Sequence, residues 1–356
     1  MTRDAGFSLV EVVMATALTM SVTGAVVSLA TPAGKLSPAL PEAVDLQQRA
    51  RVIENVLVQE LARAGAGLSA GPRSGALVES FAPVVPRRMG LLQADAFTAA
   101  RADAITLRYV PDTVAQTTVT VFTASAPSLL TTTQMPGCPS AALCGLAAGS
   151  DLFVFDKLGH ASTFTVQQLQ APIAVLDAHD VSATHAFQAG DAVAEAVSRT
   201  YYFDPAQRQL RQYDGDQSDV PVVDGVVGVT FSYFGDPNPP LAPQPSLGTA
   251  NCLYDVAGQL DPALSVLPSS GQALVALPLS MFADGPWCGA GGARFDADLL
   301  RVRSIHVNVR VEATQSSFRA QGADFAHPGL STDAWRALPD VRLSFDVAPR
   351  NLNLRR

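Results

Sequence analysis

Charged side chains are scarce in this sequence: they make up 16% of its 356 residues, whereas 48% of the residues are hydrophobic. The formal net charge is -8, and no run of five Lys or Arg residues occurs. These features exclude general nucleic-acid binding, because neutralising phosphates requires a basic face. The mean hydropathy is positive, which is high for a soluble protein but too low for a chain with many membrane spans. One membrane anchor attached to a low-charge, β-rich domain accounts for these values.

Cysteine is also sparse, with Cys138, Cys144, Cys252 and Cys288 as the four residues. No pair has C-x-x-C spacing and no histidine stands at a zinc-finger offset, so the pattern indicates no metal site. An even number of cysteines predicts two disulfides in an oxidising compartment. Proximity along the chain favours pairing the first two and the last two, although three pairings are formally possible. Four buried free thiols are the alternative, and export of the chain would weigh against it.

An apolar segment runs from Phe7 to Ala30. Its only ionisable side chain is that of Glu11. As a helix, this segment would span about 36 Å, enough to cross a hydrocarbon core ~30 Å thick. A carboxylate in hydrocarbon costs roughly 2.5–3.5 kcal/mol. Glu11 is therefore expected either to lie at the level of the lipid headgroups or to pair with an amine of another chain.

The run Gly6-Phe7-Ser8-Leu9-Val10-Glu11 resembles the class III signal of type IV prepilins. The resemblance implies that a prepilin peptidase cuts after Gly6 and that Phe7 becomes an N-methylated mature N-terminus. It also implies that Glu11 meets the N-terminal amine of a neighbouring subunit during assembly. Two alternatives are a Sec signal peptide cut after Ala30 and a plain membrane anchor. The acidic residues are out of place in a Sec signal, and a plain anchor does not require this Gly–Phe–Glu spacing.

A second, amphipathic helix is predicted from Ala43 to Ala64. Its apolar residues recur at steps of three and four: Leu46, Ala50, Ile53, Leu57, Leu61 and Ala64. Prolines between residues 32 and 41 predict a break before it, and Gly65 predicts its end. Residues 45–65 resemble the post-anchor helix of PilW-type minor pilins and GspJ-type minor pseudopilins. In those families this helix packs on a sheet, so the resemblance implies that the apolar stripe lies in the core.

Short β-type runs follow, with no helical pattern between them. They cover residues 104–110, 117–123, 151–155, 162–168, 192–203, 209–213, 226–234, 299–313 and 341–347, after a predicted loop over 66–101. Asp204 and Pro205 predict a hairpin turn between two of these runs. The succession of strands favours an antiparallel sheet over a Rossmann-type fold.

The predicted fold class is therefore α+β. Its parts are a leader peptide (1–6), a hydrophobic helix (7–31), an amphipathic helix (32–66) and a β-rich head (67–356). Residues 221–233, 301–310 and 346–351 also resemble sheet segments of the PilW family in order. The implied fold is pilin-like, with a long N-terminal helix packed on an antiparallel head. Residues 235–292 depart most from the family: they are rich in Pro and Gly and read as an insertion stapled by Cys252 and Cys288.

Three patterns resemble sites that carry chemistry. Residues 67–71 match the G-x-S-x-G string around Ser69, but a helix precedes the serine where the nucleophile elbow needs a strand. Asp177, His179, Asp180 and His185 lack the spacing of a helical metal pair and favour a solvated loop. Asp214, Asp216 and Asp219 form a weak calcium candidate that lacks the Glu of an EF-hand loop; a hairpin turn is favoured. No catalytic site and no cofactor are expected.

The resemblance implies a non-catalytic minor pilin that primes a type IV pilus or belongs to its tip complex. Its expected partners are other minor pilins, the major pilin, the prepilin peptidase and a tip adhesin, with no nucleic acid among them. The chain would lie in the bacterial inner membrane with its head in the periplasm, and later in the cell-surface pilus. Two alternatives stay open: a GspJ-like pseudopilin of a type II secretion system, and an adhesin acting through residues 235–292.

Overall fold

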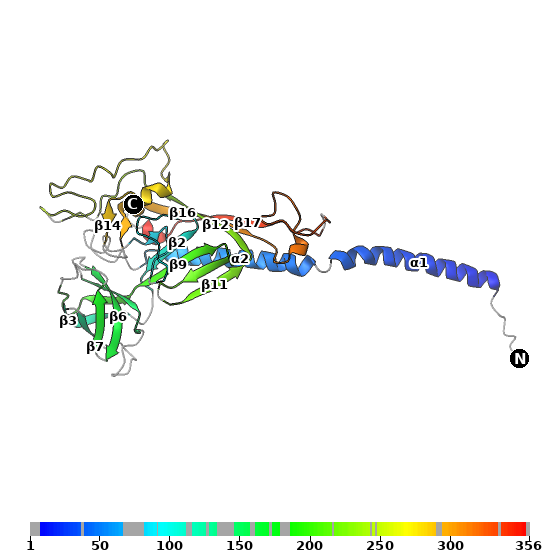
Figure 1. The fold of residues 1–356 in the computed structure, drawn as a ribbon, viewed down its shortest axis with the longest axis horizontal. Coiled ribbons are helices and arrows are strands. Elements are labelled where there is room, and N and C mark those ends of the chain that lie inside the picture. Colours follow the sequence, from blue (N-terminus) through cyan, green and yellow to red (C-terminus); the bar gives the residue numbers. More distant parts are fainter. Residues whose placement is uncertain are drawn as a thin grey trace. The chain divides into compact units, whose positions relative to one another are not determined.

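The computed structural model describes residues 8–36, 39–66, 82–90, 92–111, 116–125, 128–133, 146–156, 161–170, 173–178, 186–215, 217–242, 244–245, 248–289, 294–333 and 336–353. The chain divides into two units. The first comprises Met1–Arg51 and Val311–Val341, and the second comprises Val52–Arg310 and Arg342–Arg356. The chain forms two N-terminal helices followed by antiparallel β structure, in agreement with the predicted α+β class (Figure 1).

Helix α1 (Leu9–Leu36) contains the predicted apolar segment. Its stretch Leu9–Ser28 is long and apolar enough to cross a membrane, and none of it is buried. The hydroxyls of Thr16, Thr19 and Thr23 donate to carbonyls of the preceding turn. These bonds satisfy the polar side chains inside the helix, which makes them tolerable in hydrocarbon.

The boundary between the helices differs from the prediction. Helix α1 continues through Pro32 to Leu36, and α2 (Ala39–Arg63) begins before Pro41. A proline inside a helix removes one backbone hydrogen bond, and the flanking turns keep their own bonds. Pro41 lies in the first turn of α2, where its missing N–H has no intrahelical partner to lose. At the other end, Gly65 adopts a φ of 74°, which ends α2 as predicted.

The apolar stripe of α2 is buried, which confirms the helical period read from the sequence. Leu46 and Ala50 are buried within the first unit, and Ile53, Leu57 and Leu61 are fully buried within the second. Burying these side chains removes apolar surface from water and stabilises the helix far more than its intrinsic propensity does.

A five-stranded antiparallel sheet lies in the second unit. Its order is β1 (Val84–Val85), β2 (Ala104–Tyr109), β9 (Val197–Asp204), β10 (Gln209–Tyr213) and β11 (Asp219–Asp224). The predicted hairpin is the β9–β10 turn, where the Asp204 carboxylate accepts the N–H groups of Ala206 and Gln207. Strands β1 and β11 were not predicted, because β1 has only two residues and β11 contains Pro221.

A four-stranded sheet has the order β13 (Val275–Leu277), β12 (Val226–Gly235), β16 (Val302–Val311) and β17 (Val341–Val347). The expected strand 299–313 begins later than predicted, because the 3-10 helix η4 (Ala297–Arg301) occupies its start. The Asp296 carboxylate caps that helix by accepting the Asp298 N–H. Shorter elements are η2 (Leu279–Phe282), the pair β14 (Trp287–Cys288) and β15 (Phe295–Asp296), η5 (Ser316–Phe318) and η6 (Arg350–Leu352).

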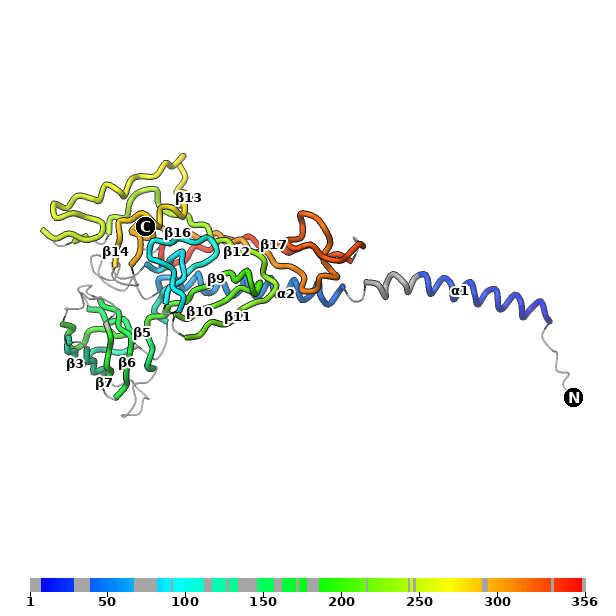
Figure 2. The backbone as a smooth tube through the Cα atoms, in the orientation of Figure 1, coloured from blue at the N-terminus to red at the C-terminus, as the bar shows by residue number. Residues whose placement is uncertain are grey.

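The sequence did not predict that six strands close into a barrel. These strands lie in the teal-to-green part of the tube in Figure 2. The order of the barrel is β3 (Gln116–Thr123), β4 (Ser128–Thr132), β7 (Ile173–Ala178), β6 (Ala161–Gln170), β5 (Asp151–Phe155) and β8 (Ala192–Glu195). Leu130, Leu152, Phe164 and Leu176 are fully buried in its core.

The barrel is inserted between two neighbouring strands of the five-stranded sheet. Strands β2 and β9 pair directly, although about ninety residues separate them along the chain. The run 192–203, predicted as one strand, is therefore two: β8 belongs to the barrel and β9 to the sheet. The change of sheet falls at Ala196, whose N–H donates to the Asp151 carbonyl.

Within the first unit, the segment Val311–Val341 packs around a small apolar cluster. Ala39, Ala313 and Phe318 are buried there, with Leu338 packed against them. Glu312 is 1% exposed, and its carboxylate contacts Arg319 at 2.9 Å and His327 Nδ1 at 2.8 Å. The buried charge is therefore compensated by a guanidinium group and a ring nitrogen.

Candidate functional site

The start of α1 carries the predicted assembly carboxylate. Glu11 Oε2 accepts the Ser8 N–H at 3.0 Å, and Ser8 Oγ accepts the Val10 N–H at 3.3 Å. This reciprocal arrangement is a capping box, in which two N–H groups left over at a helix start gain acceptors. The S-x-x-E spacing that signals it is present in the sequence, but Glu11 was expected at the lipid headgroups or against an amine, and the cap was not predicted. Gly6 and Phe7 lie outside the described residues.

The surface of α1 around Glu11 and in the following turns is apolar on all sides. Leu9, Met14, Leu18, Met20 and the valines between them are more than half exposed. A helix that is apolar all round is stable only when lipid or other protein surrounds it. A single N-terminal helix of this kind is consistent with single-pass membrane anchoring.

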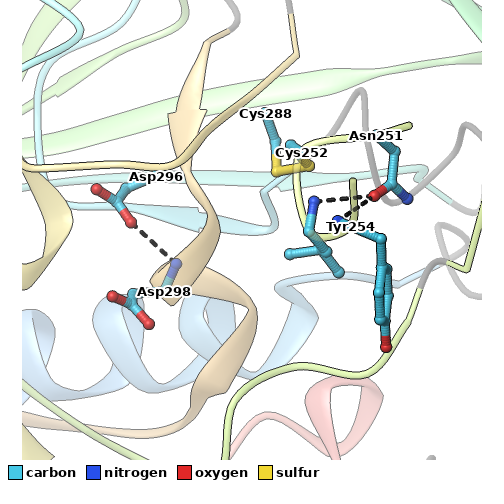
Figure 3. The surroundings of a disulfide bond; sticks show 7 residues. Asn251, Cys252, Tyr254, Cys288, Asp296 and Asp298 are labelled. Atoms are coloured by element: carbon cyan, nitrogen blue, oxygen red, sulfur yellow. Dashed lines mark hydrogen bonds between the residues drawn. A yellow bond between two sulfur atoms is a disulfide. The ribbon is translucent and has the colours of Figure 1, made fainter. Parts of the chain in front are cut away.

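Cys252 and Cys288 form a disulfide with a Cα–Cα distance of 5.1 Å, which confirms the pairing predicted for them. The bond joins an irregular loop to β14, within the segment read as an insertion (Figure 3). Next to Cys252, the Asn251 side chain accepts the N–H groups of Leu253 and Tyr254 and fixes the turn. Cys138 and Cys144 lie outside the described residues, so their pairing stays a prediction.

Three carboxylates, those of Asp284, Asp296 and Asp298, have oxygens within 4.8 Å of one another. Carboxylate oxygens are ligands that hard cations take. However, Asp296 already accepts the N–H groups of Gly285 and Asp298, and Asp298 pairs with Arg301 at 2.6 Å. Burial raises the pKa of Asp296 to about 6, opposed by these backbone bonds. Backbone capping accounts for the position of Asp296, and the ion pair accounts for that of Asp298, without a metal.

The calcium candidate is arranged differently from a cation site. The Asp219 carboxylate lies 3.0 Å from both Arg88 and Arg211 and accepts the Tyr202 hydroxyl at 2.7 Å. Burial alone would raise the pKa of Asp219, but these donors hold it below its ordinary value. Asp214 accepts the Ser218 N–H within the turn. Asp216 lies outside the described residues, and the arrangement of the other two favours the hairpin turn.

The remaining chemical patterns are largely outside the described residues. Asp177 is exposed near the end of β7, whereas His179, Asp180 and His185 are not among the described residues. Ser69 and its flanking glycines are also outside them. Asp177 belongs to β7, so the loop prediction is wrong for this residue. For the other residues the assignment to loops stays a prediction.

A buried charge on α2 was missed at the sequence level. Glu60 is 6% exposed, and its carboxylate contacts Tyr109 of β2, Arg199 of β9 and Arg63 of its own helix. Burial, and secondly the charge of Glu60, raise the pKa of Tyr109. The sequence signal was weak: Glu60 follows Leu57 by three residues, so it lies on the flank of the apolar stripe.

The fold and these sites define a class: an α+β chain with one apolar N-terminal helix and a β-rich antiparallel head. Comparison with protein-family models, with curated proteins and with solved structures gave no match in any of the three.

Proposed function

We propose that the chain is a non-catalytic minor subunit of a type IV pilus, which primes the filament or belongs to its tip complex. One observation carries the proposal: from Leu9 to Ser28 the helix exposes apolar side chains on every side, and Glu11 is its only charged residue. Such a surface fits lipid first and the core of a helical filament afterwards, because both surround it with apolar groups.

The proposed mechanism is assembly. Before processing, the helix holds the subunit in the bacterial inner membrane, with the head in the periplasm. After cleavage following Gly6, the helix moves into the filament, where Glu11 exchanges its bond to the Ser8 N–H for the amine of a neighbouring subunit. A carboxylate–ammonium pair in a low-dielectric core is stronger than a bond to a neutral amide. The neighbours are other minor pilins and the major pilin.

The amphipathic helix supports the same proposal. Its stripe is buried, and Glu60 joins it to β2 and β9 of the antiparallel sheet. An apolar helix that continues into a head-packing helix would couple the head to the filament. A GspJ-like pseudopilin would use the same arrangement in a type II secretion system.

A second candidate is an adhesin acting through residues 235–292. The disulfide-stapled loop favours it, since exposed loops held by a rigid scaffold carry many binding sites. Deletion of residues 239–274, combined with Cys288→Ser, would leave β13 in place. Normal filaments with lost adhesion would support this role, and unchanged adhesion would oppose it.

Mass spectrometry of the mature N-terminus tests the main proposal. A methylated Phe7 start is expected. A Thr31 start would indicate a Sec signal peptide, and an intact Met1 start would indicate a plain anchor; either result overturns the proposal.

A further inference from the structure

A cavity of about 540 Å³ lies where the chain passes between the five-stranded sheet and the barrel. Its walls come from the segment after β1, from β2, β9 and the turn after β10 in the sheet, and from β5, β6 and β8 of the barrel. The volume lies in the range of pockets that hold small ligands. All of these elements belong to the second unit.

The charges around the cavity nearly cancel. Three arginines and four acidic residues line it: Arg87, Arg108 and Arg199, with Asp95, Asp151, Glu195 and Asp214. A ligand carrying a net charge of either sign would meet groups of both signs in the lining. Coulomb attraction from one set would then be offset by repulsion from the other.

The arginines are engaged within the protein, Arg108 as a buried group that the charge of Asp151 attracts. Arg87 donates to the carbonyls of Phe97 and Arg294, and Arg199 pairs with Glu60 at 3.2 Å. These cations therefore form the walls rather than free anchors for an anionic ligand.

Three polar side chains in the lining are available for hydrogen bonds to a ligand. The carboxylate of Glu195 and the hydroxyls of Thr163 and Ser198 have no side-chain hydrogen-bond partner in the part of the chain that the structure describes. Burial raises the pKa of Glu195, which the charge of Arg199 partly offsets. A carboxylate accepts, and a hydroxyl both donates and accepts, so a ligand has to supply donors and acceptors together.

The cavity also has an apolar wall. Phe97 lines it, and its ring packs edge-on against Trp287 with centroids 5.0 Å apart. The guanidinium of Arg294 lies over the Phe97 ring, 5.3 Å from its centroid, so the opposite face is the one that a ligand would contact. A sugar ring presents C–H groups on a face and hydroxyls around its rim, and each hydroxyl can donate and accept. We propose that this cavity binds a short neutral carbohydrate, with Glu195, Thr163 and Ser198 bonding its hydroxyls and Phe97 contacting a ring face. The inference rests on this cavity alone and not on export or pilus assembly.

The test uses the full-length chain in detergent micelles on an array of immobilised oligosaccharides. The array carries neutral, amine-bearing and acidic members, and positives are titrated free in solution. Trp287 reports binding through its contact with Phe97, in a Trp335→Phe background that leaves it as the sole tryptophan. We expect saturable binding of neutral members together with a change in Trp287 emission.

Matched variants locate the site. Glu195→Ala removes a charged acceptor and is expected to weaken binding about tenfold or more, and Thr163→Val about three- to tenfold. Ser198→Ala is the second hydroxyl variant, and it is used if Thr163→Val lowers the melting temperature. Glu54→Ala is the control, because Glu54 is exposed on α2 and outside the cavity; its affinity should equal that of the parent.

Several outcomes would overturn the proposal. These are no neutral ligand on the array, binding only of acidic or amine-bearing members, or full affinity in folded Glu195→Ala and Ser198→Ala proteins. Because the assay needs no filament, a failure here leaves the N-terminal mass measurement unaffected, and the two proposals fail separately.

Discussion

Glu60 on α2 and Tyr109 on β2 are joined by a hydrogen bond of 3.1 Å between carboxylate and hydroxyl, at a site where Glu60 is 6% exposed. The same carboxylate contacts Arg199 on β9 at 3.2 Å. Strands β2 and β9 are the two between which the barrel is inserted. One buried charge therefore joins the helix to both strands that carry the barrel.

Removing this charge should destabilise the head. We expect Glu60→Ala to lower the free energy of unfolding by about 2–3 kcal/mol, because Tyr109 loses a charged acceptor and Arg199 loses its partner. Urea denaturation followed by circular dichroism measures the change. Exposed Glu54→Ala on the same helix is the control and should shift the value by less than about 0.5 kcal/mol. Equal effects of the two substitutions would contradict the assigned role of Glu60.

The disulfide should contribute to stability through the loop that it closes. Cys252 and Cys288 are separated by 36 residues, for which the chain-entropy relation gives about 4 kcal/mol at most. We expect the Cys252→Ser/Cys288→Ser protein to melt several degrees lower than the parent. Peptide mapping without reduction should show the peptide pair that contains these two cysteines. Detection of Cys252 joined to Cys138 or Cys144 instead would refute the pairing.

Asp296 should make stability depend on pH. Its pKa is raised to about 6 in the folded chain, from an ordinary value of 3.8, so the native state holds the proton more tightly. The free energy of unfolding should therefore fall as pH rises from about 4 to about 6, by up to about 3 kcal/mol from this group. Asp296→Asn should flatten that part of the profile.

The control for this titration is Asp177→Asn, since Asp177 is exposed on the barrel. Its profile should follow that of the parent between pH 4 and 6. If Asp296→Asn and the parent lose the same stability over this interval, another group causes the dependence.

Two substitutions separate the helix cap formed by Glu11 from its proposed pairing with an amine. Glu11→Gln keeps an oxygen acceptor for the Ser8 N–H but removes the charge, whereas Ser8→Ala removes the hydroxyl cap and keeps the charge. If Glu11 pairs with an amine, incorporation into filaments should fall strongly, by about tenfold, in Glu11→Gln and little in Ser8→Ala. Immunoblots of sheared filaments measure this. Normal incorporation of Glu11→Gln would leave helix capping as the only role.

Local patterns in the sequence predicted much of the fold. The apolar stripe of α2, the termination at Gly65, the β9–β10 hairpin and the Cys252–Cys288 pair agree with the structure. Each depends on residues close together along the chain, where side-chain period, turn chemistry or loop length acts directly. The prediction of helix ends was less exact: a break was expected at Pro32, but α1 continues through it to Leu36.

The residue pattern alone predicts an apolar N-terminal helix with a lone carboxylate, an amphipathic helix and a series of strands. The closure of six strands into a barrel, the burial of Glu60 against β2 and β9, and the two arginines that face Asp219 depend on the three-dimensional arrangement. Strand pairing and the burial of a charge are fixed by contacts between distant residues, and a period-two pattern gives the face of a strand but not its neighbour.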